Sequence, residues 1–137
     1  MSGSMTRRGV LSGAVAIAGV TVLPQFLNAR LAGRAAIRHV VVDERLIESS
    51  AFAAGIPGSR IHTVGALDDL CNRWYTQLRR QVLADARPIA GLTTWMDYVV
   101  MRSCAAEIGY VSTFHAENRS AAGHGRTVTW VFSPRSI

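Results

Sequence analysis

A short run of β-branched residues constrains the fold of this chain more than any other feature. The run is HVVVD at residues 39–43, and apolar and polar residues do not alternate within it. A strand that is apolar on both faces is typical of a parallel sheet with helices on each side. Helix formers follow over 46–54, and a second strand is predicted over 60–64, ending at Gly65. This order predicts a parallel pair with a right-handed crossover.

Two longer helices are predicted in the middle of the chain. Apolar residues at spacings of three and four define one face of the first. These residues are Leu67, Leu70, Cys71, Trp74, Leu78 and Val82. The second helix begins at a capping box that starts with Thr94, and it runs to about Ile108. Because it is apolar on most sides, we expect it either at the centre of the core or beneath a partner protein. Residues 89–92, between the two helices, are predicted to form an apolar loop.

The C-terminal part of the chain is predicted to be a hairpin. Residues 110–115 and 127–132 alternate as strands do, and a polar, glycine-containing loop over 118–125 separates them. The element order is then β-α-β-α-α-β-β. We expect an α/β fold with a small mixed sheet of about four strands, in a single domain over 39–137. Residues 30–38 are predicted to be a linker.

Composition excludes two classes of protein. Hydrophobic residues make up 49% of the chain and charged residues 18%, which is unlike a disordered protein. All 15 basic residues are arginine, and the formal net charge is +6. Acidic residues are interleaved with these arginines, whereas nucleic-acid binding requires a concentrated basic face. We therefore expect no nucleic-acid partner.

The N-terminal segment resembles a bacterial twin-arginine export signal. Arg7 and Arg8 precede an apolar stretch over 13–23, which is shorter than the roughly 20 residues that span a bilayer. The resemblance implies that the Tat translocase carries the folded protein to the periplasm, with residues 1–29 as the signal. If the signal is not cleaved, this segment would tether the protein to the inner membrane and be its only membrane contact.

Several candidate site residues lie where the first strands are expected to end. In parallel sheets, ligands bind beyond the carboxyl ends of the strands. That rule indicates Asp43 as a catalytic candidate and Arg45, Ser49 and Gly65 as ligand-binding candidates. Asp43 has a structural alternative, which is to cap the next helix or to pair with Arg45. No glycine-rich phosphate loop follows either strand, so no cofactor is expected.

His115 and Glu117 are the other catalytic candidates. They lie two residues apart on a predicted strand, so their side chains point to the same side. They could act as a general-base pair or as part of a metal site. However, the spacing of histidines and cysteines does not match a zinc site, and no metal is expected. A purely structural histidine is the alternative.

The two cysteines, Cys71 and Cys104, are predicted on the apolar sides of the two long helices. In an oxidising periplasm they could form a disulfide. Its loop would be long enough to contribute roughly 3–4 kcal/mol. They could equally be buried thiols, because a free cysteine packs as a small hydrophobe.

Two functions remain open from the sequence. The first is a non-catalytic accessory or binding protein, exported together with a larger redox subunit. The folded-export signal, the small size and the unusually apolar helix favour it. The alternative is a small periplasmic enzyme or ligand-binding domain. Its site would lie at the strand ends, around Asp43, Arg45, His115 and Glu117.

Overall fold

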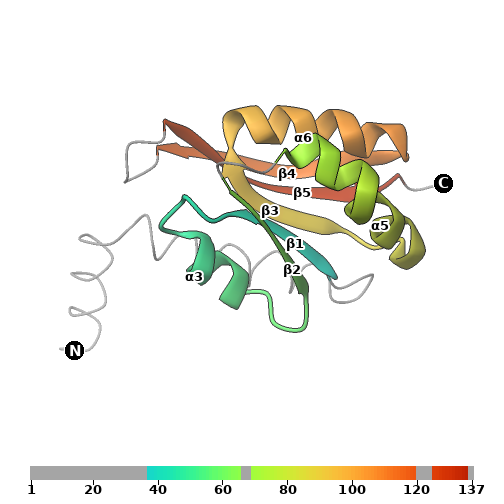
Figure 1. Cartoon of the computed structure of the whole chain (residues 1–137), viewed down its shortest axis with the longest axis horizontal. Coiled ribbons are helices and arrows are strands. Elements are labelled where there is room, and N and C mark those ends of the chain that lie inside the picture. The colour runs from blue at the N-terminus through green and yellow to red at the C-terminus, as the bar shows by residue number, and fades with distance from the viewer. Residues whose placement is uncertain (1–36, 66–68, 120–124, 136–137) are drawn as a thin grey trace.

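One mixed sheet of five strands organises the described part of the chain, which is residues 37–65, 69–119 and 125–135 of a computed structural model. The spatial order of the strands is β2-β1-β3-β5-β4 (Figure 1). The elements in chain order are β1 (His39–Asp43), α3 (Ser49–Ala54), β2 (Arg60–Val64), α4 (Leu70–Arg73), η1 (Trp74–Leu78), α5 (Arg79–Asp85), β3 (Ile89–Thr94), α6 (Trp95–Glu107), β4 (Tyr110–Arg119) and β5 (Arg126–Pro134). The predicted export signal, residues 1–29, lies outside the described residues.

The α/β class and the parallel start of the sheet are confirmed. Strand β1 pairs in parallel with β2 on one side and with β3 on the other. All five residues of β1 are buried, as expected for a strand with helices on both of its faces. Strand β5 is antiparallel to β3 and to β4, so the C-terminal hairpin completes a mixed sheet.

The predicted apolar loop over 89–92 is wrong, because these residues form β3, a fifth strand at the centre of the sheet. Ala90 and Gly91 have low strand propensity, so the local sequence did not predict this strand. Packing requires the glycine, since a Cβ at Gly91 would overlap the buried indole of Trp130. The Trp130 Nε1–H also donates to the Thr93 hydroxyl at 3.0 Å. Tertiary contacts therefore outweigh local preference here.

Helices cover both faces of the sheet (Figure 1). Helices α4, η1, α5 and α6 lie on one face, over a core that includes Trp74, Tyr98 and Trp130. Helix α3 lies on the other face, over a second core that includes Phe52. Ile37 belongs to this second core, so the core begins within the segment that was predicted to be a linker.

The helix predicted from the apolar stripe is interrupted by a π-helical segment. Leu70, Trp74, Leu78 and Val82 are buried and follow one another at intervals of four residues. On an α-helix each such step moves a side chain about 40° further around the axis. A π-helical turn contains more residues than an α-helical turn, so η1 reduces this rotation. The four side chains therefore keep facing the sheet. Cys71, in contrast to the prediction, is exposed.

Helix α6 begins and ends where its sequence predicts. The Thr94 hydroxyl oxygen accepts a hydrogen bond from the backbone N–H of Asp97 at 3.3 Å and caps the first turn. The helix ends before Gly109, whose φ of 80° is a left-handed conformation that suits glycine.

The C-terminal hairpin is longer than predicted. Strand β4 extends to Arg119 and β5 begins at Arg126, so two residues of the predicted polar loop, Asn118 and Arg119, are paired strand. Within the described ranges, no helix is long and apolar enough to cross a membrane.

Candidate functional site

The residues predicted at the strand ends lie at the carboxyl-terminal edge of the sheet, whereas His115 lies in the middle of β4. Strand β4 runs in the same direction as β1 and β3, because both β3 and β4 are antiparallel to β5. The carboxyl ends of β1, β3 and β4 therefore share this edge. The helix after β1 covers one face and the helix after β3 the other, which is the topological switch point where α/β sheets bind ligands.

At this edge Asp43 and Arg45 form a bidentate ion pair. Asp43 is fully buried. Arg45 Nε donates to Asp43 Oδ1 at 2.9 Å, and Arg45 Nη2 donates to Asp43 Oδ2 at 2.5 Å. The hydrogen bond to Asp43 raises the pKa of the Arg45 guanidinium. The ion pair is the structural alternative that the sequence left open for Asp43.

Asp97, in the first turn of α6, adds a second carboxylate beside Arg45. Its Oδ2 lies 4.0 Å from Arg45 Nη2. Burial, together with the charge of Asp43, raises the pKa of Asp97. The Arg45 guanidinium thus forms ion pairs with two carboxylates at the end of β1. In the sequence, Asp97 is the last residue of the capping box that starts with Thr94, and that pattern does not indicate its place here.

Ser49 and Gly65 have structural contacts at the same edge. The Ser49 hydroxyl donates to the backbone carbonyl of Asp43. Gly65 follows β2, and a Cβ there would overlap the Glu44 carboxylate. The two residues thus help to position the segment that follows β1.

His115 and Glu117 share one face of β4, as alternation predicted, but they lie apart from Asp43. Their register partners, Trp130 and Val128, both belong to the core beneath α6. Strands β3 and β5 separate β4 from β1, which corresponds to roughly 14 Å across the sheet. The catalytic candidates therefore do not converge on one site.

Each of these two residues has its own partner. The His115 ring stacks on Tyr98 with the ring centroids 5.7 Å apart. Glu117 Oε1 accepts a hydrogen bond from Arg126 Nη1 at 2.9 Å, and the Arg126 guanidinium also lies over the Trp95 ring. The arrangement is that of a packed surface strand.

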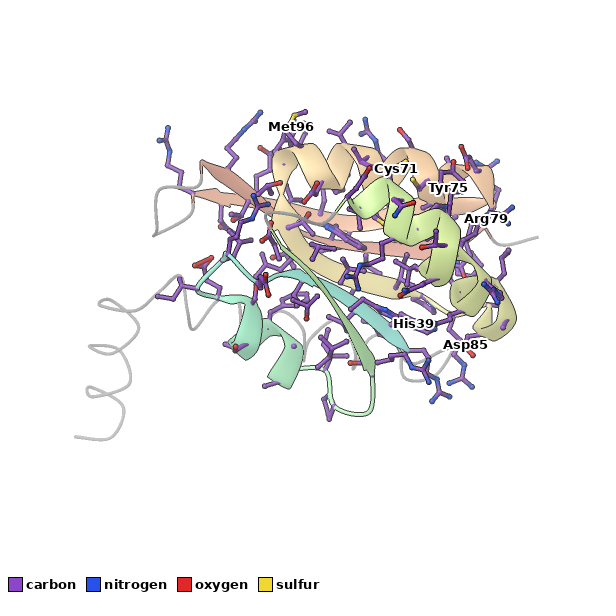
Figure 2. All side chains as sticks on the ribbon, viewed as in Figure 1. His39, Cys71, Tyr75, Arg79, Asp85 and Met96 are labelled. Carbon is purple, nitrogen blue, oxygen red and sulfur yellow. The ribbon has the colours of Figure 1, made fainter. Side chains whose placement is uncertain are left out.

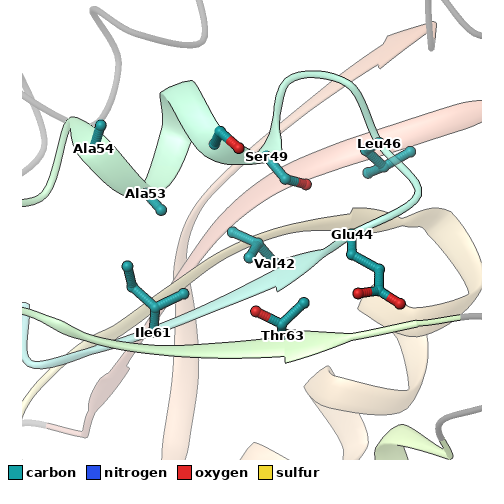
Figure 3. Close-up of a pocket in the computed structure, with 9 residues that line it drawn as sticks. Val42, Glu44, Leu46, Ser49, Ala53, Ala54, Ile61 and Thr63 are labelled. Atoms are coloured by element: carbon teal, nitrogen blue, oxygen red, sulfur yellow. The ribbon is translucent and has the colours of Figure 1, made fainter.

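A hollow of about 400 Å³ opens between α3 and the outer part of β2 (Figure 3). Five aliphatic and four polar residues line it: Val42, Leu46, Ala53, Ala54, Ile61, Glu44, Ser49, Ser50 and Thr63. Its volume lies within the range of small-molecule pockets. Of the predicted ligand-binding residues, Ser49 lines the hollow, whereas Arg45 and Gly65 do not.

The opposite edge of the sheet holds a hydrogen-bonded chain of two buried histidines and one exposed aspartate, which the sequence pattern did not predict. Asp85 Oδ2 lies 2.5 Å from His39 Nε2, and His39 Nδ1 lies 3.1 Å from His62 Nε2. Burial, together with the charges of His39, Arg60 and Arg73, lowers the pKa of His62 to about 4. Parallel pairing of the two strands signals the His39–His62 contact. Asp85 comes from the end of α5, and no local pattern indicates its position.

Comparison with known proteins does not identify a family for this chain. No protein-family model and no curated protein sequence matches this chain. Among the described residues there is no group of three or more histidine, cysteine, aspartate or glutamate side chains that could hold a metal ion.

Proposed function

We propose that this chain is an exported, non-catalytic accessory protein that binds a larger partner through the outer face of α6. One observation carries the proposal. Helix α6 lies at the surface of the molecule, and its first two turns carry an exposed methionine, Met96, with Val99 and Val100 beside it (Figure 1). The sequence left two explanations for so apolar a helix, and the surface position favours coverage by a partner.

The outer face of α6 has a definite apolar patch. The inner face is buried and packs on the sheet, through Tyr98 and Met101 among others. On the opposite side Met96 is 70% exposed, and Val99 and Val100 beside it are partly buried and also pack against the core beneath α6. We call Met96, Val99 and Val100 the outer α6 patch. Exposed methionine and aliphatic groups at helical spacing are typical of a helix face that packs on another protein.

The contacts of the catalytic candidates also support a non-catalytic role. Asp43 is paired with Arg45, Glu117 with Arg126, and His115 stacks on Tyr98. A general base or a nucleophile has to face a cavity where a substrate can be placed. The hollow beside α3 lies away from His115 and Glu117, and its lining does not include Asp43.

Export in the folded state fits a protein that travels with a partner. The twin-arginine segment, with Arg7 and Arg8, predicts this route. We propose that the partner is a larger redox subunit, because subunits that acquire a cofactor in the cytoplasm must cross the membrane already folded. The periplasm, or the periplasmic side of the inner membrane, is then the working location.

Substitution in the outer α6 patch should release the partner. We expect Met96→Glu to reduce recovery of one co-purifying subunit about tenfold or more, because a charge would be buried in the apolar contact. The measurement is affinity purification of the tagged full chain from the periplasm, with quantitative mass spectrometry. Leu83→Glu is the matched control. Leu83 is 45% exposed and lies on α5, so its substitution should leave recovery unchanged.

Two results would contradict the proposed partner. In the first, the wild-type chain is recovered only as a monomer or bound only to copies of itself. In the second, Met96→Glu and Leu83→Glu retain the subunit equally well. Either result would mean that the outer α6 patch does not bind a larger subunit.

Export can be tested separately. Arg7→Lys combined with Arg8→Lys should leave the full-length precursor in the cytoplasm, because the translocase reads the arginine pair. Cell fractionation and immunoblotting measure this, and the matched control is Arg30→Lys with Arg34→Lys. Normal periplasmic delivery of the Arg7/Arg8 variant would refute the predicted route.

The hollow beside α3 supports a second candidate function, which is binding of a small ligand. Its aliphatic wall suits an apolar group, and Glu44, Ser49 and Thr63 offer polar contacts (Figure 3). This candidate predicts no effect of Met96→Glu, so the partner experiment also distinguishes the two functions.

A further inference from the structure

A seam between two parallel helical segments brings the two cysteines together. Helix α4 packs against α6. The Tyr75 hydroxyl donates to Glu107 Oε1 across the seam at 2.6 Å. Cys71 precedes Tyr75 by four residues and Cys104 precedes Glu107 by three, so each cysteine lies one turn back on the side that faces the seam. Figure 2 shows Cys71 and Tyr75 along this outer edge.

The two thiols are neighbours and differ in accessibility. Cys71 lies close enough to raise the pKa of the Cys104 thiol, and neither cysteine is part of a disulfide in this structure. Cys71 is exposed, whereas Cys104 is only 5% exposed. An external reagent can therefore reach Cys71 first.

We propose that Cys71 and Cys104 form a disulfide by exchange with an external disulfide, with Cys71 reacting first and Cys104 closing the bond. The linkage would join α4 to α6 beside the outer α6 patch. It would close a loop of about 33 residues that contains η1, α5 and β3. The exchange needs no protein partner, so it does not rest on the proposed accessory function.

The exchange balances in two steps. The Cys71 thiolate attacks one sulfur of the external disulfide, forms a mixed disulfide and releases the other sulfur as a thiolate. The Cys104 thiolate then attacks Cys71 Sγ and releases the second external thiolate. In total, two protein thiols are oxidised, the external disulfide is reduced to two thiols, and no further oxidant is required.

Closure by Cys104 should be the slower step. Burial raises the pKa of the Cys104 thiol to about 12, with a smaller contribution from Cys71. Little thiolate is therefore present near neutral pH, and the mixed disulfide on Cys71 should accumulate before it resolves. Its resolution should become about tenfold faster for each pH unit between pH 7 and pH 9, in proportion to the thiolate fraction.

The test uses the purified, reduced full chain with oxidised glutathione, followed by mass spectrometry and peptide mapping. The wild type should pass through a glutathione adduct on Cys71 and end as an intramolecular Cys71–Cys104 disulfide. Cys104→Ser should remain as the adduct, and Cys71→Ser should stay unmodified on the same timescale. The oxidised wild type should melt at least about 10 °C above the reduced protein.

Three results would overturn the proposal. They are free thiols in the wild type after prolonged exposure to oxidised glutathione, disulfides only between molecules, and modification of Cys71→Ser as fast as of Cys104→Ser. Peptide mapping of the wild type decides the question even if a variant does not fold. If the disulfide does not form, the proposed accessory function is still open, because the Met96→Glu experiment measures partner binding and not thiol oxidation.

Discussion

Replacement of Arg45 by methionine is expected to lower the free energy of unfolding by about 3 kcal/mol. The substitution keeps most of the aliphatic stem but leaves the carboxylate of Asp43 buried without its cation. Removing one partner of a buried ion pair costs about 3–5 kcal/mol, and in this pair only Asp43 is fully buried, because the Arg45 side chain is 38% exposed. We expect the lower end of that range, because the backbone N–H of Arg45 still donates to Asp43 Oδ1 at 2.9 Å. Urea denaturation at neutral pH measures the change.

The double variant Asp43→Asn with Arg45→Met provides the control. It removes both charges, so it should be clearly more stable than Arg45→Met alone, although less stable than the wild type. This double-mutant cycle measures the coupling between the two side chains. If Arg45→Met unfolds at the wild-type urea concentration, Asp43 does not depend on Arg45, and its role at the switch point would have to be reconsidered.

Local patterns were enough to predict much of the fold. The continuous run of β1 predicted a strand buried on both faces, and alternation predicted a C-terminal hairpin. Thr94 and Gly109 marked the ends of α6 correctly. In each case the signal comes from residues within one turn or one strand, where backbone geometry and burial act directly.

The missed features depend on contacts between distant residues. Strand β3 contains Gly91 because Trp130, 39 positions later, occupies the space above it. Likewise Asp85 reaches His39 only because the end of α5 lies beside the start of β1. Periodicity carries no information on such contacts. It predicts which element a residue belongs to, but not which distant residues pack against it.

The candidate site shows the same limit. Strand ends predicted Asp43, Arg45 and Ser49 at one edge, where the structure has them, and alternation predicted His115 and Glu117 on one face. The number of strands between the two groups depends on sheet order, and an extra central strand increases it. Whether residues at one edge form a single site is therefore a property of topology.

The stability of the protein should fall as the pH is lowered from about 6.5 to about 4. The pKa of His62 is about 4 in the folded protein, whereas an unperturbed histidine has a pKa of 6.5. Between these values the unfolded chain binds a proton that the folded chain does not, so acid favours unfolding. Stability from this group is complete above pH 6.5 and is lost progressively down to pH 4. The total is about 3 kcal/mol, at about 1.4 kcal/mol per pH unit.

The neighbours of His62 explain why the proton is excluded. His62 is only 7% exposed, so its imidazolium would lose most of its hydration. Arg60 and Arg73 oppose a further positive charge, and Asp85 is already engaged with His39. A neutral His62 can still form a hydrogen bond with His39 Nδ1. The folded state therefore favours the neutral ring over the whole range in which a free histidine would gain its charge.

Substitution of His62 tests this assignment against other acid-sensitive groups. His62→Gln removes the titration, so the difference in unfolding free energy between wild type and variant should shrink by about 3 kcal/mol from pH 7 to pH 4. Carboxylates titrate in both proteins and largely cancel from this difference. Thr63→Ser is the control on the same strand, and it should leave the pH dependence parallel to the wild type. A constant difference between wild type and His62→Gln would show that His62 is not the group that makes the fold sensitive to acid.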